Sequence, residues 1–402
     1  FIVGCFITTM LTAIIILIPF WKLKSKKFVV HRFIQLFLGL LINTMLLVRK
    51  QYFQKENLNF KKPSILIANH SSFLDILMLG MLHPKIIILV GKWVYTSPLF
   101  GWFIRFADYI PAFLPLEDNI DKIKSLVADG YSIVIFPEAH RSVDGKLKRF
   151  HKGAFYLSEI LQLSITPILL HSTNYTLPKG EFYVKSSWLN LKVLPPIAWD
   201  DFSYGLGYSE RAKSITKYYK KQFAKFCEER ENEAYLRYPI QYAYLYKGPI
   251  LEWYFKIKYK FESENYRLVN LYTANKKQVY DLGCGYGFLS YYLHLKDKKR
   301  QITAIDYDDD KISVAANCYL KSSSVLFKAE DLNACKIEAA DVIVLSDVLH
   351  YLQPENQLAL LNKCIENLQN DGLILLKDGF EENQEKHSWT LTSERWSTQW
   401  LK

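Results

Sequence analysis

The segment SILIANHSSFLD (64–75) joins a short apolar run to a region that begins with polar residues. The run SILIA is rich in Ile and has the length of a buried β-strand. Ser72 and Asp75 have the spacing of a capping box, which predicts that a helix begins soon after the strand. A buried strand that leads almost directly into a helix indicates an α/β domain.

The same alternation continues on the C-terminal side of this segment. Stretches 119–130 and 152–163 have helical patterns and separate further apolar runs. Those runs are KIIILV (85–90), SIVIF (132–136) and TPILL (166–170). We therefore predict an α/β domain over residues 28–201.

A second strand and helix alternation begins near Gln278. Its predicted strands are QVYDL, ITAID, DVIVLS and GLILLK. This pattern predicts a second, Rossmann-like α/β domain over residues 276–402. The intervening residues 202–275 are rich in Tyr and Lys, and we interpret them as a helical linker without a binding role.

Residues 1–20 contain no charge and nearly reach the ~20 apolar residues that cross a bilayer as a helix. Residues 1–27 are therefore predicted to be a transmembrane helix with a basic flank, which places the following domains on the cytoplasmic side of an inner membrane. The chain opens at Phe1 rather than Met, which suggests a fragment. A second apolar run, 33–48, is short and is expected to lie in the interface or against the next domain, with a second span as the alternative.

The net charge of +11 is concentrated near the N-terminus, where residues 1–62 hold ten Lys or Arg and one acidic residue. Basic residues beside apolar runs suit an anionic bilayer, and we find no basic stripe on the folded domains, so nucleic acid is not an expected partner. The six cysteines form no CxxC pair. Neither a metal site nor a disulfide framework is therefore expected.

His70 and Asp75 are the first candidates for catalysis. If His70 precedes the helix and Asp75 lies in its first turn, the carboxylate can hold one imidazole nitrogen and leave the other as a general base. Asp75 as a capping residue alone is the structural alternative. Since the chain has no G-x-S-x-G elbow, the hydroxyl activated by His70 is expected to belong to the substrate.

FPEAHRS (136–142) follows the predicted strand SIVIF and carries Glu138 and Arg141. More basic residues follow it, and together they can form a cationic rim for a phosphate or another anion. A solvated basic loop is the alternative. These residues are Lys146, Lys148, Arg149 and Lys152.

The two motifs together resemble those of the glycerophospholipid acyltransferase family, NHxxxxD and FPEGTRS. The resemblance covers about residues 28–200. It implies His70 as the catalytic base with Asp75, and substrate binding by Glu138, Arg141, Ser142 and Lys152. The implied reaction moves an acyl group from coenzyme A or acyl carrier protein to the hydroxyl of a lysophospholipid-like acceptor, without a metal.

The chain departs from the family pattern at two places. Ala139-His140 stands where the family usually has Gly-Thr, which makes the turn less permissive. Arg105 lies several residues before the position at which the family generally has a phosphate-binding Arg. Both departures leave the acyl acceptor open.

VYDLGCGYGFLSYYL (279–293) has the form of a strand, a Gly-rich turn and a helix. Its G-x-G-x-G spacing disfavours a dinucleotide site, because Phe288 stands where the third fingerprint Gly would be. Asp306 follows the next strand and can accept hydrogen bonds from ribose hydroxyls. Asp331 follows a third strand, and His350, after a fourth, is interpreted as a packing residue rather than a base.

This second pattern resembles class I S-adenosylmethionine-dependent methyltransferases. The resemblance implies that S-adenosylmethionine is the cofactor, with Asp306 at the ribose and Asp331 at the adenine. The residues at its amino-acid end would be Asp281, Gly283, Gly285 and Gly287. The chain stops before the terminal hairpin of that fold, so we expect a truncated domain.

The order of the predicted segments, a membrane helix followed by an acyltransferase-like and a methyltransferase-like domain, resembles the C-terminal part of a group of trifunctional proteins. These proteins join an MMPL-type transporter to a lysophospholipid acyltransferase and a methyltransferase. The resemblance implies a membrane-associated, two-enzyme protein of phospholipid biosynthesis whose partners are membrane lipids and an acyl thioester. The alternative is a lipid exporter's cytoplasmic tail, whose soluble domains only bind lipid and S-adenosylmethionine.

Overall fold

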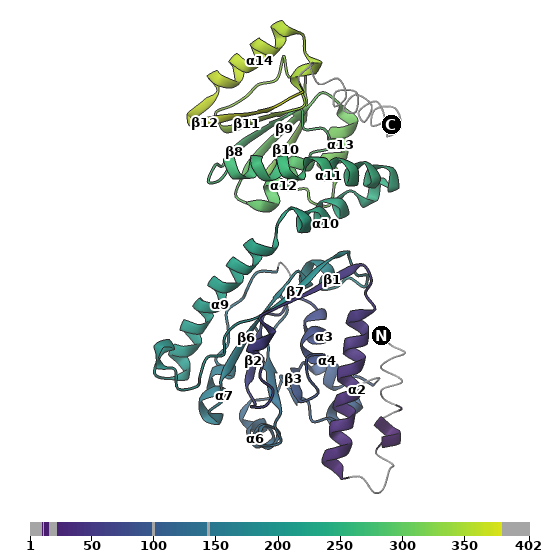
Figure 1. Cartoon of the computed structure of the whole chain (residues 1–402), viewed down its shortest axis with the longest axis vertical. Coiled ribbons are helices and arrows are strands. Elements are labelled where there is room, and N and C mark those ends of the chain that lie inside the picture. The colour runs from purple at the N-terminus through teal and green to yellow at the C-terminus, as the bar shows by residue number, and fades with distance from the viewer. Residues whose placement is uncertain (1–9, 11, 16–21, 99–100, 143–144, 380–402) are drawn as a thin grey trace. The chain divides into compact units, whose positions relative to one another are not determined.

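The computed structural model describes residues 10, 12–15, 22–98, 101–142 and 145–379. The chain folds into two compact units, residues 1–230 and 231–402. Each unit contains a β-sheet with helices packed against it (Figure 1). The α/β class predicted for both domains is therefore confirmed.

The first unit is built on a seven-stranded sheet with the order β1-β7-β6-β2-β5-β3-β4. All its neighbouring strands are parallel except β6 and β7, which are antiparallel. The strands are β1 (Val48–Phe53), β2 (Ile65–Ala68), β3 (Ile86–Val90), β4 (Ile110–Pro111), β5 (Ser132–Ile135), β6 (Ile165–His171) and β7 (Ser187–Val193). The four predicted strands are β2, β3, β5 and β6, whereas β1, β4 and β7 were not predicted.

Alternating side chains of β2 enter two different hydrophobic cores. Leu66 and Ala68 belong to the core that α2 and α3 cover, whereas Ile65 and Ile67 belong to the core beneath α6, α7 and α9. Successive residues of a strand point to opposite faces of a sheet, so a strand buried on both faces is apolar throughout. The unit therefore has three layers, with helices on both faces of the sheet.

The helices of this unit lie between and around the strands. They are α2 (Leu23–Asn43), α3 (Leu74–Gly80), α4 (Lys92–Tyr95), α5 (Gly101–Phe106), α6 (Ile120–Ala128), α7 (Gly153–Leu161), α8 (Thr173–Thr176) and α9 (Tyr208–Arg230). Short 3₁₀ turns occur at Lys55–Asn57, Glu117–Asn119 and Phe202–Tyr204.

Helix α2 packs on α3 along one side. Val30, Ile34 and Ile42 on that side are buried, whereas Leu36 and Leu40 are more than half exposed. The predicted packing of an apolar helix on the domain is therefore present, but the helix covers 23–43 rather than 33–48. No helix among the described residues has both the length and the apolar character required to cross a bilayer. Most of the predicted transmembrane segment, 1–20, lies outside the described residues.

The second unit contains a five-stranded, entirely parallel sheet with the order β10-β9-β8-β11-β12. Its strands are β8 (Gln278–Leu282), β9 (Gln301–Asp306), β10 (Val325–Ala329), β11 (Ala340–Ser346) and β12 (Leu368–Lys377). Its helices are α10 (Glu233–Ala243), α11 (Pro249–Tyr272), α12 (Phe288–Lys296), α13 (Asp309–Asn317) and α14 (Pro354–Glu366), with 3₁₀ turns at Leu245–Lys247 and Leu349–Tyr351. The strand order reverses between β8 and β11, and ligands of open α/β sheets bind at such a switch point.

The predicted helical linker over 202–275 is not a separate segment. Helix α9 belongs to the first unit, where it packs against α7 and β6, while α10 and α11 belong to the second and pack against α12. The reason is visible on α9, where Ile215, Tyr219 and Phe226 are buried at helical spacing. This apolar stripe was not recognised in the sequence because the segment is rich in Tyr and Lys.

Candidate active site and cofactor pocket

The residues of NHSSFLD and FPEAHRS lie at the carboxyl ends of two neighbouring strands. β2 ends at Ala68 and β5 ends at Ile135, and Ile67 of β2 is paired with Ile135 of β5. Parallel strands end at the same edge of a sheet, so the two motifs meet there. The backbone N–H of Ser142 donates to the carbonyl of His70 at 2.8 Å and joins the two loops.

His70 lies before helix α3 and is held by Asp75 in its first turn. The His70 Nδ1 is 2.8 Å from Asp75 Oδ2, and the same oxygen accepts the backbone N–H groups of Ser71 and Ser72 at 2.7 and 2.8 Å. Asp75 is fully buried, and the imidazole stacks on Phe136 with ring centroids 4.1 Å apart. The carboxylate therefore accepts a hydrogen bond from Nδ1–H, which leaves Nε2 as the basic nitrogen.

Glu138 contributes to the loop geometry through both of its carboxylate oxygens. Oε1 accepts the backbone N–H of His70 at 3.0 Å, and Oε2 accepts that of Lys148 at 2.8 Å. Glu138 is only 3% exposed, and this burial raises its pKa, although the two backbone donors oppose the shift. A carboxylate in this position orders the His70 loop and is poorly suited to contact a phosphate directly.

The basic residues of this region differ in their exposure. Arg141 is half-buried and follows directly on the Glu138 turn, while Lys152 is exposed at the start of α7. Ser142 is buried, and Lys148 donates through Nζ to the Arg141 carbonyl at 3.1 Å. Arg105 is directed elsewhere, since its Nη1 donates to the carbonyl of Tyr95 at 2.6 Å. Arg141 and Lys148 thus lie on the loop that contacts Glu138, whereas Lys152 lies further along the chain, at the start of α7.

The second unit contains a cavity of about 630 Å³ at the carboxyl edge of its sheet, within the usual range for small-molecule sites. Among the residues predicted to hold the cofactor, Asp281, Gly283, Gly285, Asp306 and Asp331 line this cavity. Gly287 is not among the lining residues, and it packs against the Phe327 ring, which a Cβ at that position would meet at 2.5 Å. His350 is also absent from the lining and is bound through Nδ1 to Asp378 at 2.6 Å.

The Gly-rich turn leaves room for a ligand. Gly283 has a φ of +77°, and a Cβ there would lie 2.0 Å from Val348, whereas a Cβ on Gly285 would meet nothing within 4 Å. Asp306 Oδ2 accepts the backbone N–H of Gly285 at 2.7 Å and fixes the turn. These residues fit a nucleoside ligand that approaches the turn closely and reaches the Asp306 carboxylate.

Asp281 is buried at the end of β8. Burial raises its pKa to about 6, although the Ser290 hydroxyl, which donates to Asp281 Oδ2 at 2.5 Å, opposes the shift. The neighbouring Asp306 carboxylate raises it further. A positively charged ligand group near Asp281 would favour its ionised form.

Two protein families match separate parts of the chain. The model of the Acyltransferase family matches residues 49–171, and the family model described as a methyltransferase domain matches residues 279–372. The chain therefore carries an acyltransferase domain followed by a methyltransferase domain.

Curated relatives of two kinds resemble parts of the chain. A 1-acyl-sn-glycerol-3-phosphate acyltransferase of Limnanthes alba is 33% identical over 150 residues, which are 36% of this chain and 53% of the relative. Carboxy-S-adenosyl-L-methionine synthase of Vibrio campbellii is 31% identical over 118 residues, 28% of this chain and 48% of the relative. The chain thus spans about half the length of these relatives.

A solved structure also resembles part of the chain. It is the 1-acyl-sn-glycerophosphate acyltransferase PlsC from Thermotoga maritima, with 22% identity and a TM-score of 0.48. The match covers 56% of this chain and 90% of that one.

Helix α11 contributes four lining residues to this cavity that the sequence analysis missed. Tyr254, Lys258, Glu262 and Tyr266 of α11 line the cavity, although this helix was predicted to be a linker without a binding role. They are spaced at every fourth residue, so they share one face of the helix. This polar and aromatic stripe could have indicated a binding face. It was not recognised because Tyr and Lys are abundant throughout the region.

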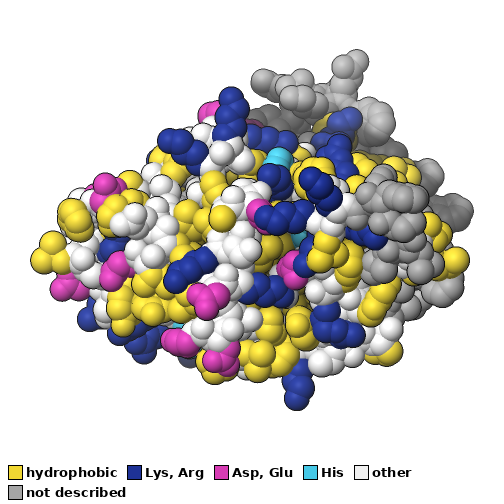
Figure 2. All heavy atoms as spheres, turned by 90° about the horizontal axis from the view of Figure 1, so that it is seen from below, with side chains coloured by type: hydrophobic (Ala, Val, Ile, Leu, Met, Phe, Trp, Pro, Cys, Tyr) yellow, Lys and Arg dark blue, Asp and Glu magenta, His cyan; other side chains and the backbone are white. Residues whose placement is uncertain are grey.

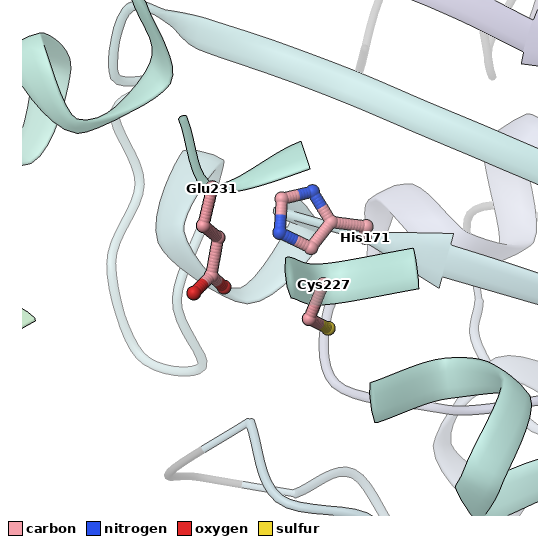
Figure 3. Close-up of side chains that lie close together, drawn as sticks. All are labelled: His171, Cys227 and Glu231. Carbon is pink, nitrogen blue, oxygen red and sulfur yellow. The ribbon is translucent and has the colours of Figure 1, made fainter. Parts of the chain in front are cut away.

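Strand β6 ends in His171, which lies near Cys227 of α9 (Figure 3). The Asn190 Nδ2 donates to His171 Nδ1 at 3.0 Å. Glu231, also drawn in Figure 3, is the first residue of the second unit. Two ligands are fewer than the three or four protein ligands of zinc sites, so the described residues of the first unit do not by themselves build such a site.

Proposed function

We propose that the acyltransferase domain transfers an acyl group from a thioester of coenzyme A or acyl carrier protein to the hydroxyl of a lysophospholipid-like acceptor, with His70 as the general base. The observation that carries this proposal is the His70 Nδ1 to Asp75 Oδ2 contact of 2.8 Å, with the carboxylate fixed by two backbone N–H groups. The resemblance to 1-acyl-sn-glycerol-3-phosphate acyltransferases supports it.

The proposed reaction needs only one proton carrier. Nε2 of His70 takes the proton of the acceptor hydroxyl while its oxygen attacks the thioester carbonyl carbon. The carbon–sulfur bond then breaks, an ester remains, and the proton passes from His70 to the leaving sulfur as a free thiol. Asp75 stabilises the imidazolium between the two transfers.

Arg141 and Lys152 are proposed to bind the phosphate of the acceptor, and Ser142 to contribute to the same site. Arg141 follows the turn that Glu138 and His70 share, so a phosphate bound by its guanidinium lies near the reacting hydroxyl. Glu138 is proposed to support this site from behind by holding the loop.

The test measures thiol release by the full chain from an acyl-coenzyme A in the presence of several lysophospholipids. His70→Ala is expected to lower kcat at least about a hundredfold, because general-base catalysis contributes ~10²–10⁴. The matched control is His83→Ala, since His83 precedes β3 at the opposite edge of the sheet. Undiminished turnover in His70→Ala would remove His70 from its role as base.

The acyltransferase unit is further proposed to work at a membrane surface. Leu36, Leu40, Leu46 and Leu47 are between 53% and 91% exposed on and after α2, close in sequence to Arg49 and Lys50. Figure 2 shows Lys and Arg side chains among hydrophobic ones, with Asp and Glu side chains between them. Such mixed surfaces bind anionic interfaces. Because acyl thioesters and S-adenosylmethionine are made in the cytoplasm, we propose the cytoplasmic side of the inner membrane.

For the methyltransferase domain, we propose that S-adenosylmethionine binds in the cavity of the second unit. Asp306 would hold the ribose hydroxyls, Asp331 the adenine, and Asp281 with the Gly283 and Gly285 turn the amino-acid end. The cofactor supplies the methyl group when bound. Calorimetry should show weaker binding in Asp306→Ala and unchanged binding in Asp309→Ala, an exposed neighbour. Equal affinity in both variants would contradict this assignment.

A further inference from the structure

The hydroxyl of Tyr219 lies beside the catalytic loop, although the residue is far from it in the sequence. Tyr219 is on α9, which follows the end of the acyltransferase family match, and it is 0% exposed. Its hydroxyl accepts the backbone N–H of Asn69 at 2.8 Å. The hydroxyl proton has two acceptors within reach, the carbonyl of Ile168 at 2.6 Å and Asn69 Oδ1 at 2.9 Å, and it is donated to one of them at a time.

Asn69 is held on its other side by β6. Its Nδ2 donates to the Leu170 carbonyl and its Oδ1 accepts the Leu170 N–H, both at 2.8 Å. The backbone and the side chain of Asn69 are therefore both fixed, and the next residue in the chain is His70. Buried polar groups that satisfy each other in this way hold a single geometry.

The surroundings of Tyr219 keep its hydroxyl protonated. Burial raises its pKa well above 10, the Asn69 N–H opposes the shift, and the nearby Glu138 and Asp75 carboxylates add to it. Its ring packs edge-on against Phe150 at 5.0 Å within the core beneath α9. The Tyr219 hydroxyl is thus a fixed hydrogen-bond partner of Asn69 that stays protonated.

We propose that Tyr219 is a positioning residue of the acyltransferase, which holds His70 in its reactive place through Asn69. The catalytic machinery then includes α9 and extends beyond the segment that carries the two motifs. This inference rests on the proposed role of His70 as base. It predicts that loss of one oxygen atom on α9 slows the chemical step without weakening substrate binding.

The first experiment compares Tyr219→Phe with Tyr218→Phe, its half-buried neighbour on the same helix. Per folded enzyme, Tyr219→Phe is expected to lower kcat about 10- to 100-fold with KM within about twofold, since a displacement of about 1 Å costs that much. Tyr218→Phe is expected to match the wild type. A wild-type kcat in Tyr219→Phe, or a loss confined to KM, would overturn the proposal.

A second measurement separates this inference from the proposed function. In protein labelled with ¹⁵N-histidine, the Nδ1–H signal of His70, assigned by its loss in His70→Ala, should shift or exchange faster with water in Tyr219→Phe but not in Tyr218→Phe. This NMR measurement does not require acyl transfer. An inactive wild type would refute the proposed function, whereas the Nδ1–H signal would still test whether Tyr219 positions His70. If Tyr219→Phe does not fold, Asn69→Ser is compared in the same two ways, and unchanged kcat and signal there would overturn the proposal.

Discussion

At the residue scale, Ala139 adopts a backbone conformation that suits glycine better. Its φ is +61° in the turn between Glu138 and His140, at the position where the sequence departs from the family motif. The left-handed region costs an L-residue roughly 1–2 kcal/mol, whereas glycine loses about 0.5–1 kcal/mol through its extra freedom in the unfolded chain. Ala139 is thus strained at a position where the family motif usually has glycine.

Ala139→Gly is therefore expected to raise the free energy of unfolding by about 0.5–1 kcal/mol, measured by denaturant titration. The control is Ala224→Gly at an exposed position within α9, which should lower the same quantity by about 1 kcal/mol. Equal destabilisation by the two changes would contradict the claim of strain at Ala139.

At the scale of elements, the docking of α2 depends on a buried imidazole. His31 is 3% exposed and lies between Tyr109 and Tyr131, with ring centroids 5.6 and 5.0 Å away. Burial lowers its pKa to about 4, although the Asp108 carboxylate and the Ala107 carbonyl oppose the shift. Folded protein therefore keeps His31 neutral at pH values where the unfolded chain takes up a proton.

Because the pKa of His31 is lower in the folded protein than in the unfolded chain, the folded protein should become less stable as the pH falls. As the pH falls from about 6.5 to about 4, the free energy of unfolding should lose about 3 kcal/mol from this group. Denaturant titrations at pH 7, 5 and 4 should show a smaller loss in His31→Gln than in the wild type. The exposed His151→Gln variant should retain the wild-type slope. A His31→Gln slope equal to that of the wild type would exclude His31 as the source.

The outer side of α2 carries the prediction for membrane binding. Replacing both Leu36 and Leu40 by Gln should reduce partitioning into vesicles with anionic phospholipid about tenfold or more, because each buried Leu contributes over 1 kcal/mol. The corresponding change at Leu271, 58% exposed on α11, serves as the control. Unchanged sedimentation of the Leu36→Gln, Leu40→Gln protein with vesicles would exclude α2 as the contact.

Elements with a strong local signal were predicted well from the sequence, and the others were not. β2 and β5 are apolar on both faces, so their position and the motifs that follow them could be read directly. β1 is an edge strand with the mixed sequence VRKQYF, and its pairing with β7 depends on residues over 130 positions away. The Tyr219 contact with Asn69 spans 150 positions, and no local pattern encodes it.

At the scale of the whole molecule, two sites stand on two separate sheets. The His70 site belongs to the first unit and the cavity to the second, and each unit has its own hydrophobic core. His70→Ala should therefore leave the affinity for S-adenosylmethionine unchanged in calorimetry, and Asp306→Ala should leave thiol release unchanged. Loss of both properties in either variant would show that the sites depend on each other.

The central claim is that the chain transfers an acyl group rather than hydrolysing a thioester. The most direct measurement is mass spectrometry of the lipid formed by the full chain from acyl-coenzyme A and 1-acylglycerol 3-phosphate, with the released thiol quantified in the same sample. The proposed chemistry predicts one diacylated lipid for each thiol released, and neither product in His70→Ala. Thiol release without acylated lipid, or equal product from His70→Ala, would contradict it.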